Sequence, residues 1–299
     1  MTDSFDCAII GGGPAGLVAA LYLSRFRRSV LIADKGSSRA ALIPLSHNYP
    51  GFPEGVSGKR LLTRLHQQIR HYGSPTRGGA ALALEKRGPA WRVVMHDQVA
   101  TARQVLFATG VVDRWPSLLG AEQAIEQGAL RFCPICDGFE ARDARVAVIG
   151  DGDHAAREAL FVSAYSASVS LLTDGQALSP PMRARLLAEQ VMVTPFKPGS
   201  LRFAGGLIHA AGPAGEDLQP YAIAYGALGV EPQTQLLASL GASLDVAGCV
   251  AVDAHQQTSI PGLYAAGDVV RGLDQISVAV GEAAIAATAI HNHLREQDG

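Results

Sequence analysis

The chain has 299 residues, of which 48% are hydrophobic and 17% charged, and its net charge is −2. This composition is typical of a globular α/β protein and excludes a disordered or fibrous chain. The small net charge does not favour nucleic acid or a membrane surface as a partner. There is no apolar run long enough to span a bilayer, and the acidic start has none of the features of a secretory signal. We therefore expect a cytoplasmic protein with no nucleic acid and no membrane partner.

The first predicted elements are a strand over residues 6–10, a glycine loop, a helix that ends near Arg25 and a second strand over residues 29–33. In a G-x-G-x-x-G loop the glycines allow a tight turn, close approach to a pyrophosphate and close helix packing. The helix N-terminus adds positive partial charge. Asp34 follows the second strand, where an acid can accept hydrogen bonds from a ribose hydroxyl. The loop residues that we assign to a bound FAD are Gly11, Gly13, Pro14, Ala15 and Gly16.

A further apolar strand, residues 104–107, ends in the small-residue turn Ala108-Thr109-Gly110. We assign Thr109 and Gly110 to the same FAD site.

Cys133 and Cys136 form a C-x-x-C pair within the segment 132–140. This spacing lets two sulfurs meet, so the pair can cycle between dithiol and disulfide. Asp137 follows immediately and is a candidate proton donor and acceptor for the departing thiol. The sequence therefore predicts a redox-active centre at Cys133, Cys136 and Asp137.

The pattern does not favour a metal site. A structural zinc needs four ligands, and the other two cysteines, Cys7 and Cys249, lie in distant apolar runs. We interpret both as buried, inert strand residues. The histidines show no companion spacing, so we predict no metal.

A second copy of the first unit begins at residue 145. With Gly11 aligned on Gly150, the loop, the helix and the following strand over residues 168–172 align without a gap. Two such units indicate two dinucleotide-binding folds in one chain. Gly150, Gly152 and Ala155 are the candidate contacts of NADPH or NADH.

The second copy leaves the electron donor open. Its loop contains the acids Asp151 and Asp153, and its strand ends at Thr173-Asp174-Gly175-Gln176 without the arginine that NADP's extra phosphate would need. This pattern favours NADH over NADPH, or poor binding of any nicotinamide.

The last predicted elements are a short strand that ends in Gly267-Asp268 and a helix over residues 278–294. An acid at position 268 can bind the ribitol hydroxyls of FAD. Gln275 and Ile276 open the helix, whose N-terminal dipole could stabilise negative charge on a reduced flavin. We therefore add Gly267, Asp268, Gln275 and Ile276 to the FAD site.

In this order the motifs resemble the low-molecular-weight thioredoxin reductase family (class II of the FAD-dependent pyridine nucleotide-disulfide oxidoreductases) over nearly the whole chain. The resemblance implies an α/β fold with two Rossmann-like dinucleotide-binding domains, the second inserted in the first. Residues 1–112 and 227–299 would form the FAD-binding domain. Residues 113–226 would form a nucleotide-binding-like domain that carries the cysteines.

The resemblance also implies an FAD-dependent disulfide reductase of thioredoxin reductase type. Cys136 would face the flavin, Cys133 would exchange with substrate, and Asp137 would be the acid. The implied substrate is a thioredoxin-like protein or a small disulfide, and the implied assembly is a homodimer in which the nucleotide domain rotates.

Three alternatives stay open. Relatives without the basic cluster after the second-copy strand include ferredoxin-driven reductases and dithiol oxidases that use oxygen. The oxidases often have histidine after the second cysteine, whereas this chain has Asp137, which favours a reductase. A flavin-bearing redox sensor with slow turnover is the third.

Overall fold

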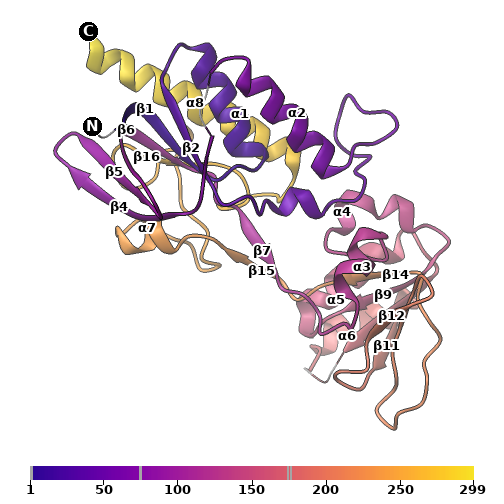
Figure 1. Ribbon diagram of the computed structural model, residues 1–299. Helices are drawn as coiled ribbons and strands as arrows, with labels where there is room; N and C mark the ends of the chain where they lie inside the picture. Colours follow the sequence, from indigo (N-terminus) through magenta and orange to yellow (C-terminus); the bar gives the residue numbers. More distant parts are fainter. Residues whose placement is uncertain (1–2, 74–75, 174, 176) are drawn as a thin grey trace. The chain divides into compact units, whose positions relative to one another are not determined.

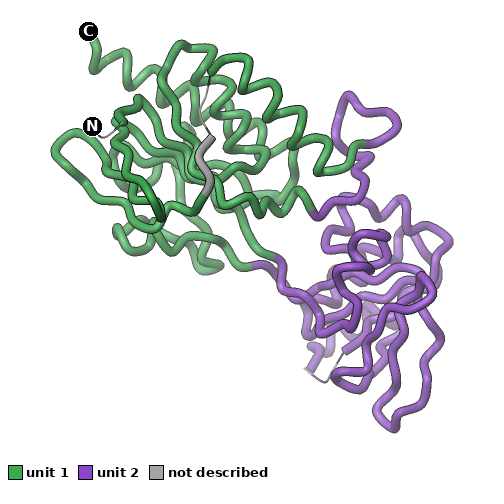
Figure 2. Tube along the Cα trace, viewed as in Figure 1, with its two compact units in different colours: residues 1–41, 56–112, 231–299 green, residues 42–55, 113–230 purple. Residues whose placement is uncertain are grey.

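The computed structural model describes residues 3–73, 76–173, 175 and 177–299. The chain forms two compact units (Figure 2). Unit 1 comprises Met1–Ala41, Val56–Val112 and Glu231–Gly299, and unit 2 comprises Leu42–Gly55 and Asp113–Val230. Both segments of unit 2 are therefore inserted in the sequence of unit 1.

Unit 1 is built on one mixed sheet with the strand order β3-β2-β1-β6-β5-β4, and β16 pairs in parallel with the end of β6. The strands β3, β2, β1 and β6 run parallel, whereas β5 is antiparallel to both of its neighbours. The strands are β1 (Asp3–Ile10), β2 (Val30–Asp34), β3 (Thr76–Gly78), β4 (Ala81–Arg87), β5 (Ala90–Met95), β6 (Val99–Phe107) and β16 (Leu263–Ala265).

Three helices cover one face of this sheet (Figure 1). They are α1 (Pro14–Arg25), α2 (Gly58–Arg70) and α8 (Ile276–Asp298), and α1 packs against both α2 and α8. The other face carries a separate apolar cluster that includes Ala8, Ile10 and Val93 and reaches Leu237 of α7 (Gln235–Ser239). Because both faces are covered, β1 and β2 are almost continuously apolar, as parallel strands usually are.

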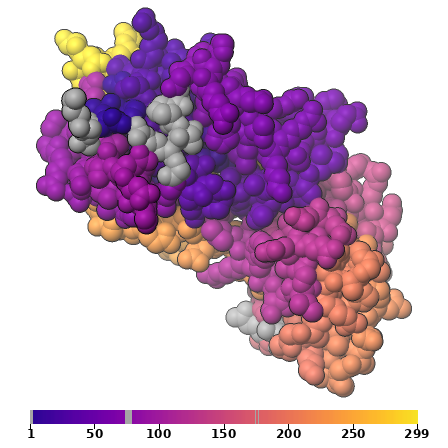
Figure 3. Space-filling model, in the orientation of Figure 1, coloured from indigo at the N-terminus to yellow at the C-terminus, as the bar shows by residue number. Residues whose placement is uncertain are grey.

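Unit 2 contains a parallel sheet with the order β11-β10-β9-β14-β8. Its strands are β8 (Leu130–Arg131), β9 (Arg145–Ile149), β10 (Ser168–Thr173), β11 (Met192–Pro195) and β14 (Ile223–Gly226). The helices are α3 (Ala121–Glu126), α4 (Pro134–Asp137), α5 (Gly152–Ser163) and α6 (Pro180–Ala188), and β12 (Arg202–Ala204) pairs with β13 (Leu207–His209) in a hairpin. Exposed side chains of β11 and β12 belong to the orange surface of this unit in Figure 3.

The internal repeat predicted from the sequence is present. In the first copy the N–H of Gly11 donates to the carbonyl of Ala33, and in the second the N–H of Gly150 donates to that of Leu172. In each copy the loop is therefore hydrogen-bonded to the C-terminal end of the neighbouring parallel strand, β2 or β10. The predicted α/β fold with an inserted second Rossmann-like domain is confirmed.

The chain passes from one unit to the other at residues 112–113 and 230–231, where β7 (Val111–Asp113) pairs with β15 (Val230–Pro232). The loop Leu42–Gly55 also belongs to unit 2. One contact that ties this loop to the rest of unit 2 is the ion pair between His47 Nδ1 and Glu140 Oε1 at 3.0 Å.

The two remaining cysteines differ from each other. Cys7 is fully buried in β1, as predicted, and burial raises the pKa of its thiol. The prediction for Cys249 is wrong, because this residue is half-buried in a loop. The Asp245 carboxylate accepts hydrogen bonds from the N–H groups of Ala247 and Cys249, at 2.8 and 3.0 Å, and so holds a turn where the apolar run indicated a strand.

Over the described part of the chain, no group of three or more His, Cys, Asp or Glu side chains is placed to hold a metal ion. Nor does any helix within those residues combine the length and apolar character that a membrane span requires.

Substitution of Leu171 tests the core of unit 2. This residue of β10 is fully buried, and we expect Leu171→Ala to lower the free energy of unfolding by roughly 2–5 kcal/mol because it removes packed methyl groups and leaves a cavity. The control is Leu187→Ala on α6, where the side chain is 79% exposed and the expected change is within about 0.5 kcal/mol. Urea unfolding followed by circular dichroism measures both. Equal effects of the two substitutions would contradict the assigned core.

Candidate functional site

The first glycine loop is held against its neighbouring strand by direct backbone contact. A Cβ added at Gly11 would lie 2.2 Å from the carbonyl oxygen of Ala108, and one added at Gly16 would lie 2.0 Å from that of Gly11. Only glycine fits at either position. As a result α1 begins at Pro14, directly beyond the end of β1, with its N-terminus at the carboxyl edge of the sheet.

Asp34, the last residue of β2, extends its carboxylate across this loop. The Oδ2 atom lies 2.1 Å from the place where a Cβ on Gly12 would be, so a side chain at that position would displace this carboxylate. The other oxygen accepts a hydrogen bond from the N–H of Gly36 at 2.9 Å. An acceptor is thus fixed beside the loop, where the ribose of a dinucleotide binds in doubly wound folds.

The Gly267-Asp268 segment lies against the same loop. A Cβ on Gly267 would come within 2.9 Å of the Ala15 side chain, and Gly267 has a φ of +81°, which favours glycine. The carboxylate of Asp268 is held by Arg39, whose Nη1 lies 3.1 Å from Oδ2. This contact positions an acid close to the N-terminus of α1.

Glu282 of α8 also supports this segment and was not predicted. Its Oε2 accepts a hydrogen bond from the N–H of Gly267 at 2.8 Å. Burial raises the pKa of this carboxyl, the hydrogen bond from Gly267 opposes the rise, and the nearby Asp268 adds to it. Nothing in the local spacing of the sequence indicates this contact.

The remaining candidate FAD residues lie in unit 1 as well. The hydroxyl of Thr109 donates to the carbonyl of Gln233 at 2.7 Å, and Gly110 turns with a φ of +64°. Gln275 is the N-cap of α8, and Ile276 is its first residue. A glycine loop, a helix N-terminus and fixed carboxylates at one sheet edge fit a flavin dinucleotide. Gly11–Gly16 and Asp34 would then hold its adenosine diphosphate part, and Asp268 its ribitol.

Cys133 and Cys136 form a disulfide in unit 2, with their Cα atoms 5.3 Å apart. Cys133 is the N-cap of α4, and the N–H of Cys136 donates to its sulfur at 3.2 Å. That N–H would stabilise negative charge on Cys133 once the disulfide is reduced. The sulfurs are half-buried, whereas the side chain of Ile135 between them is exposed.

Asp137 lies in a polar cluster beside the disulfide. Its Oδ1 accepts a hydrogen bond from the hydroxyl of Tyr225 at 2.9 Å, and its Oδ2 lies 3.7 Å from Nη1 of Arg131. Burial raises the pKa of the Asp137 carboxyl, while Arg131 and the Tyr225 hydroxyl oppose the rise and Glu140 adds to it. A carboxyl with a raised pKa holds its proton closer to neutral pH, as a proton donor to a departing thiolate requires.

Tyr225 and Arg131 were not predicted from the sequence. Tyr225 is completely buried in β14, and its hydroxyl contacts both the carbonyl and the carboxylate of Asp137. Arg131 also donates to the carbonyl of Asp137 at 3.0 Å and to that of Gly128 at 2.8 Å. Two residues from separate strands therefore fix the orientation of this acid.

The second glycine loop, like the first, packs directly against the end of a neighbouring strand. A Cβ on Gly150 would lie 2.5 Å from the carbonyl oxygen of Ala227 and 2.9 Å from the Cβ of Ala155. Gly152 has a φ of +64° at the start of α5, and Ala155 is buried. The three candidate nucleotide contacts are thus brought together at the end of β9. Asp174 and Gln176, which follow β10 where an arginine is missing, lie outside the described residues.

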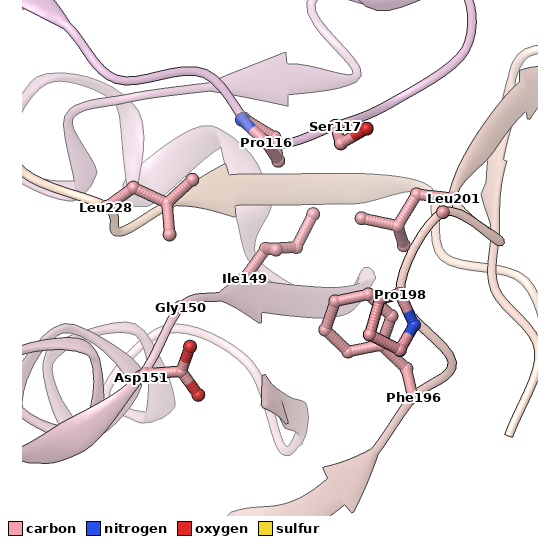
Figure 4. Close-up of a pocket in the computed structure, with 10 residues that line it drawn as sticks. Pro116, Ser117, Ile149, Gly150, Asp151, Phe196, Pro198, Leu201 and Leu228 are labelled. Carbon is pink, nitrogen blue, oxygen red and sulfur yellow. The ribbon is translucent and has the colours of Figure 1, made fainter. Parts of the chain in front are cut away.

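A pocket of about 130 Å³ opens beside this loop (Figure 4). In the figure the carboxylate of Asp151 and the ring of Phe196 lie below Ile149, while Pro116 and Ser117 lie above it. The pocket is lined by Pro116, Ser117, Ile149, Gly150, Asp151, Phe196, Pro198, Gly199, Leu201 and Leu228. It lies beyond the carboxyl ends of the strands, where nucleotides bind in such sheets. Its volume is too small for a whole dinucleotide and would hold only part of one.

Comparison with known proteins gives a consistent picture. The family model described as pyridine nucleotide-disulphide oxidoreductase matches residues 5–193 and 214–283. The chain is 30% identical over 306 residues to a thioredoxin reductase from Mycolicibacterium smegmatis, covering 98% of this chain and 97% of that protein. It is 31% identical over 307 residues to a bifunctional thioredoxin reductase/thioredoxin from Mycobacterium leprae (strain TN), covering 98% of this chain and 67% of that protein.

The crystal structure of a thioredoxin reductase from Streptococcus pyogenes MGAS5005 superposes with a TM-score of 0.90. The two sequences are 27% identical, and the superposition covers 99% of this chain and 100% of the S. pyogenes chain.

Substitution of Tyr225 tests how Asp137 is controlled. The Tyr225 hydroxyl donates to the ionised carboxylate, so Tyr225→Phe should raise the pKa of Asp137 further. The rate of disulfide exchange should fall at high pH as Asp137 loses its proton, and this alkaline limb should be lost in Asp137→Asn. In Tyr225→Phe we expect the alkaline limb to move to higher pH. Rates of reaction with a small aromatic disulfide across pH 5–10 measure this shift. Tyr221→Phe is the matched control, because this equally buried tyrosine packs beneath Arg145. An unchanged limb in Tyr225→Phe would contradict the assigned role.

Proposed function

The chain belongs to the pyridine nucleotide-disulphide oxidoreductase family and is an FAD-dependent thiol–disulfide oxidoreductase of the thioredoxin reductase type; on that premise we propose that it takes electrons from a reduced pyridine nucleotide and reduces a thioredoxin-like protein or a small disulfide. The observation that carries this proposal is the Cys133–Cys136 disulfide, followed at once by a half-buried acid. Thioredoxin is the favoured partner, because the relatives named above are thioredoxin reductases and one of them also carries a thioredoxin.

FAD, when bound, supplies the two electrons that reduce the disulfide. The residues of this chain then complete the exchange. Cys133, as a thiolate, attacks one sulfur of the substrate disulfide, and a mixed disulfide forms as the substrate's other sulfur leaves. Asp137 gives its proton to that departing sulfur. The ionised Asp137 then takes the proton of Cys136, whose thiolate attacks the sulfur of Cys133, re-forms the internal disulfide and releases the second substrate sulfur as a thiolate.

The surroundings of the two cysteines favour Cys133 as the nucleophile and Asp137 as the proton donor. The N–H of Cys136 points at the sulfur of Cys133 and stabilises its thiolate. Arg131 and Tyr225 keep Asp137 in place through its carbonyl as well as its carboxylate. The assignment of Cys136 as the sulfur that faces the flavin follows from the family resemblance.

The acid also favours the reductase direction. Oxidase relatives often carry histidine after the second cysteine, whereas here a carboxyl with a raised pKa occupies that position. The proposal further includes a homodimer in the cytoplasm, where the unpaired thiols of Cys7 and Cys249 would stay reduced.

The direction of flow is tested with the flavin-loaded protein. With a reduced pyridine nucleotide we expect catalytic reduction of thioredoxin or of a small disulfide, and Cys133→Ser and Cys136→Ser should each abolish it. Cys249→Ser is the control, because this free cysteine is half-buried and should leave turnover within about twofold. Peroxide is measured in parallel with a dithiol substrate under air. Stoichiometric peroxide without disulfide reduction would identify an oxidase and overturn the proposal.

A further inference from the structure

The two nucleotide loops place their acids differently. With Gly11 aligned on Gly150, Gly12 aligns with Asp151 and Asp34 aligns with Thr173. The first copy thus has glycine in the loop and an acid at the strand end, whereas the second has an acid in the loop and a small hydroxyl at the strand end.

The backbone confirms that these positions correspond. The carbonyl of Asp34 accepts a hydrogen bond from the N–H of Gly79, and the carbonyl of Thr173 accepts one from the N–H of Phe196. Each of these donors directly follows the next parallel strand, β3 or β11. The side chains can therefore be compared position by position.

In both copies a carboxylate lies between the loop and the strand end. In unit 1 it comes from Asp34 and passes over Gly12. In unit 2 it comes from Asp151, and the hydroxyl of Thr173 donates to its Oδ1 atom. Thr173 is buried, and its own oxygen accepts a hydrogen bond from the N–H of Gly175 at 3.3 Å, so this hydroxyl is firmly placed.

We propose that Asp151 is the specificity residue of the second nucleotide fold: its carboxylate binds the ribose hydroxyls of the adenosine half of NADH and excludes NADPH. This inference rests on the proposed function, which requires a pyridine nucleotide donor. The bond from Thr173 orients the Asp151 carboxylate, an acceptor group of the kind that ribose hydroxyls bind. The 2′-phosphate of NADPH would meet the same carboxylate with like charge.

The sequence around β10 supports the same choice. No lysine or arginine occurs in the sequence between Arg157 and Arg183, a stretch that includes the whole of β10 and its end. A 2′-phosphate would therefore lack the arginine that NADP sites use next to this strand.

The loop's second acid is directed elsewhere. The carboxylate of Asp153 accepts a hydrogen bond from the N–H of Ser179, the N-cap of α6, at 2.9 Å. Hydrogen bonds from Ser179 lower the pKa of this carboxyl. Asp153 therefore links α5 to α6, while Asp151 remains at the lining of the pocket beside Ile149 and Gly150 (Figure 4).

The test is equilibrium binding to the oxidised, flavin-loaded enzyme, measured by calorimetry. The probes are NAD⁺ and NADP⁺, together with the fragments 5′-AMP and 2′,5′-ADP, which differ by the same 2′-phosphate. We expect the wild type to bind NAD⁺ and 5′-AMP at least about tenfold more tightly than their phosphorylated counterparts. Asp151→Gly restores the first-copy loop and should reduce this ratio to near one by weakening NAD⁺. Asp151→Asn removes only the charge and should improve NADP⁺ binding. Thr173→Val should give a smaller loss of selectivity.

The matched control is Asp153→Asn, which should leave the ratio unchanged. Two results would overturn the inference: tighter NADP⁺ than NAD⁺ binding in the wild type, or equal gains for both ligands in Asp151→Gly, which would make Asp151 a block to any nucleotide. The proposed function is checked separately with dithionite-reduced enzyme. If that enzyme still reduces a disulfide, failure of the binding test removes only the role of Asp151.

Discussion

The close contact between each glycine loop and its neighbouring strand is the constraint on which the rest of the molecule depends. No side chain fits between Gly11 and the carbonyl of Ala108, or between Gly150 and that of Ala227. The backbone therefore turns directly from strand into helix, and the helix N-terminus reaches the carboxyl edge of the sheet. The ends of β2 and β10 then lie beside the loops, which is where we propose that one carboxylate at each edge contacts the bound nucleotide.

The redox centre depends on a different principle, the placement of a few buried polar groups. Asp137 lies largely out of water, which favours its protonated form, yet Tyr225 and Arg131 give its ionised form partners. These opposing effects set the pKa of Asp137 above that of a free carboxyl while keeping hydrogen-bond partners for its ionised form. The Cys133 thiolate would be stabilised separately, by the N–H of Cys136. Proton transfer and nucleophilic attack are thus assigned to neighbouring residues with distinct surroundings.

Most of the features that were predicted from the sequence rest on short-range patterns. The glycine spacing and the C-x-x-C pair each lie within a few residues, and the repeat of strand, loop, helix and strand aligns without a gap, so the sequence displays all three directly. The contacts of Tyr225 with Asp137 and of Arg39 with Asp268 join residues far apart in the chain, and only tertiary packing reveals them. The mistaken strand at Cys249 has a local cause, since the Asp245 side chain caps a turn there. The alignment of the two copies places Asp34 opposite Thr173. The inference that Asp151 replaces Asp34 in the second copy depends on the positions of the side chains.

The central claim is that bound FAD and the Cys133–Cys136 disulfide share electrons. Anaerobic titration of the flavin-loaded protein with dithionite, followed by flavin absorbance and by thiol counting after each addition, tests this claim most directly. The disulfide and the flavin each take up two electrons, so the wild type should accept four per bound FAD and gain two thiols, whereas a Cys133→Ser/Cys136→Ser variant should accept two and gain none. Uptake of only two electrons by the wild type, with its disulfide intact, would contradict the account.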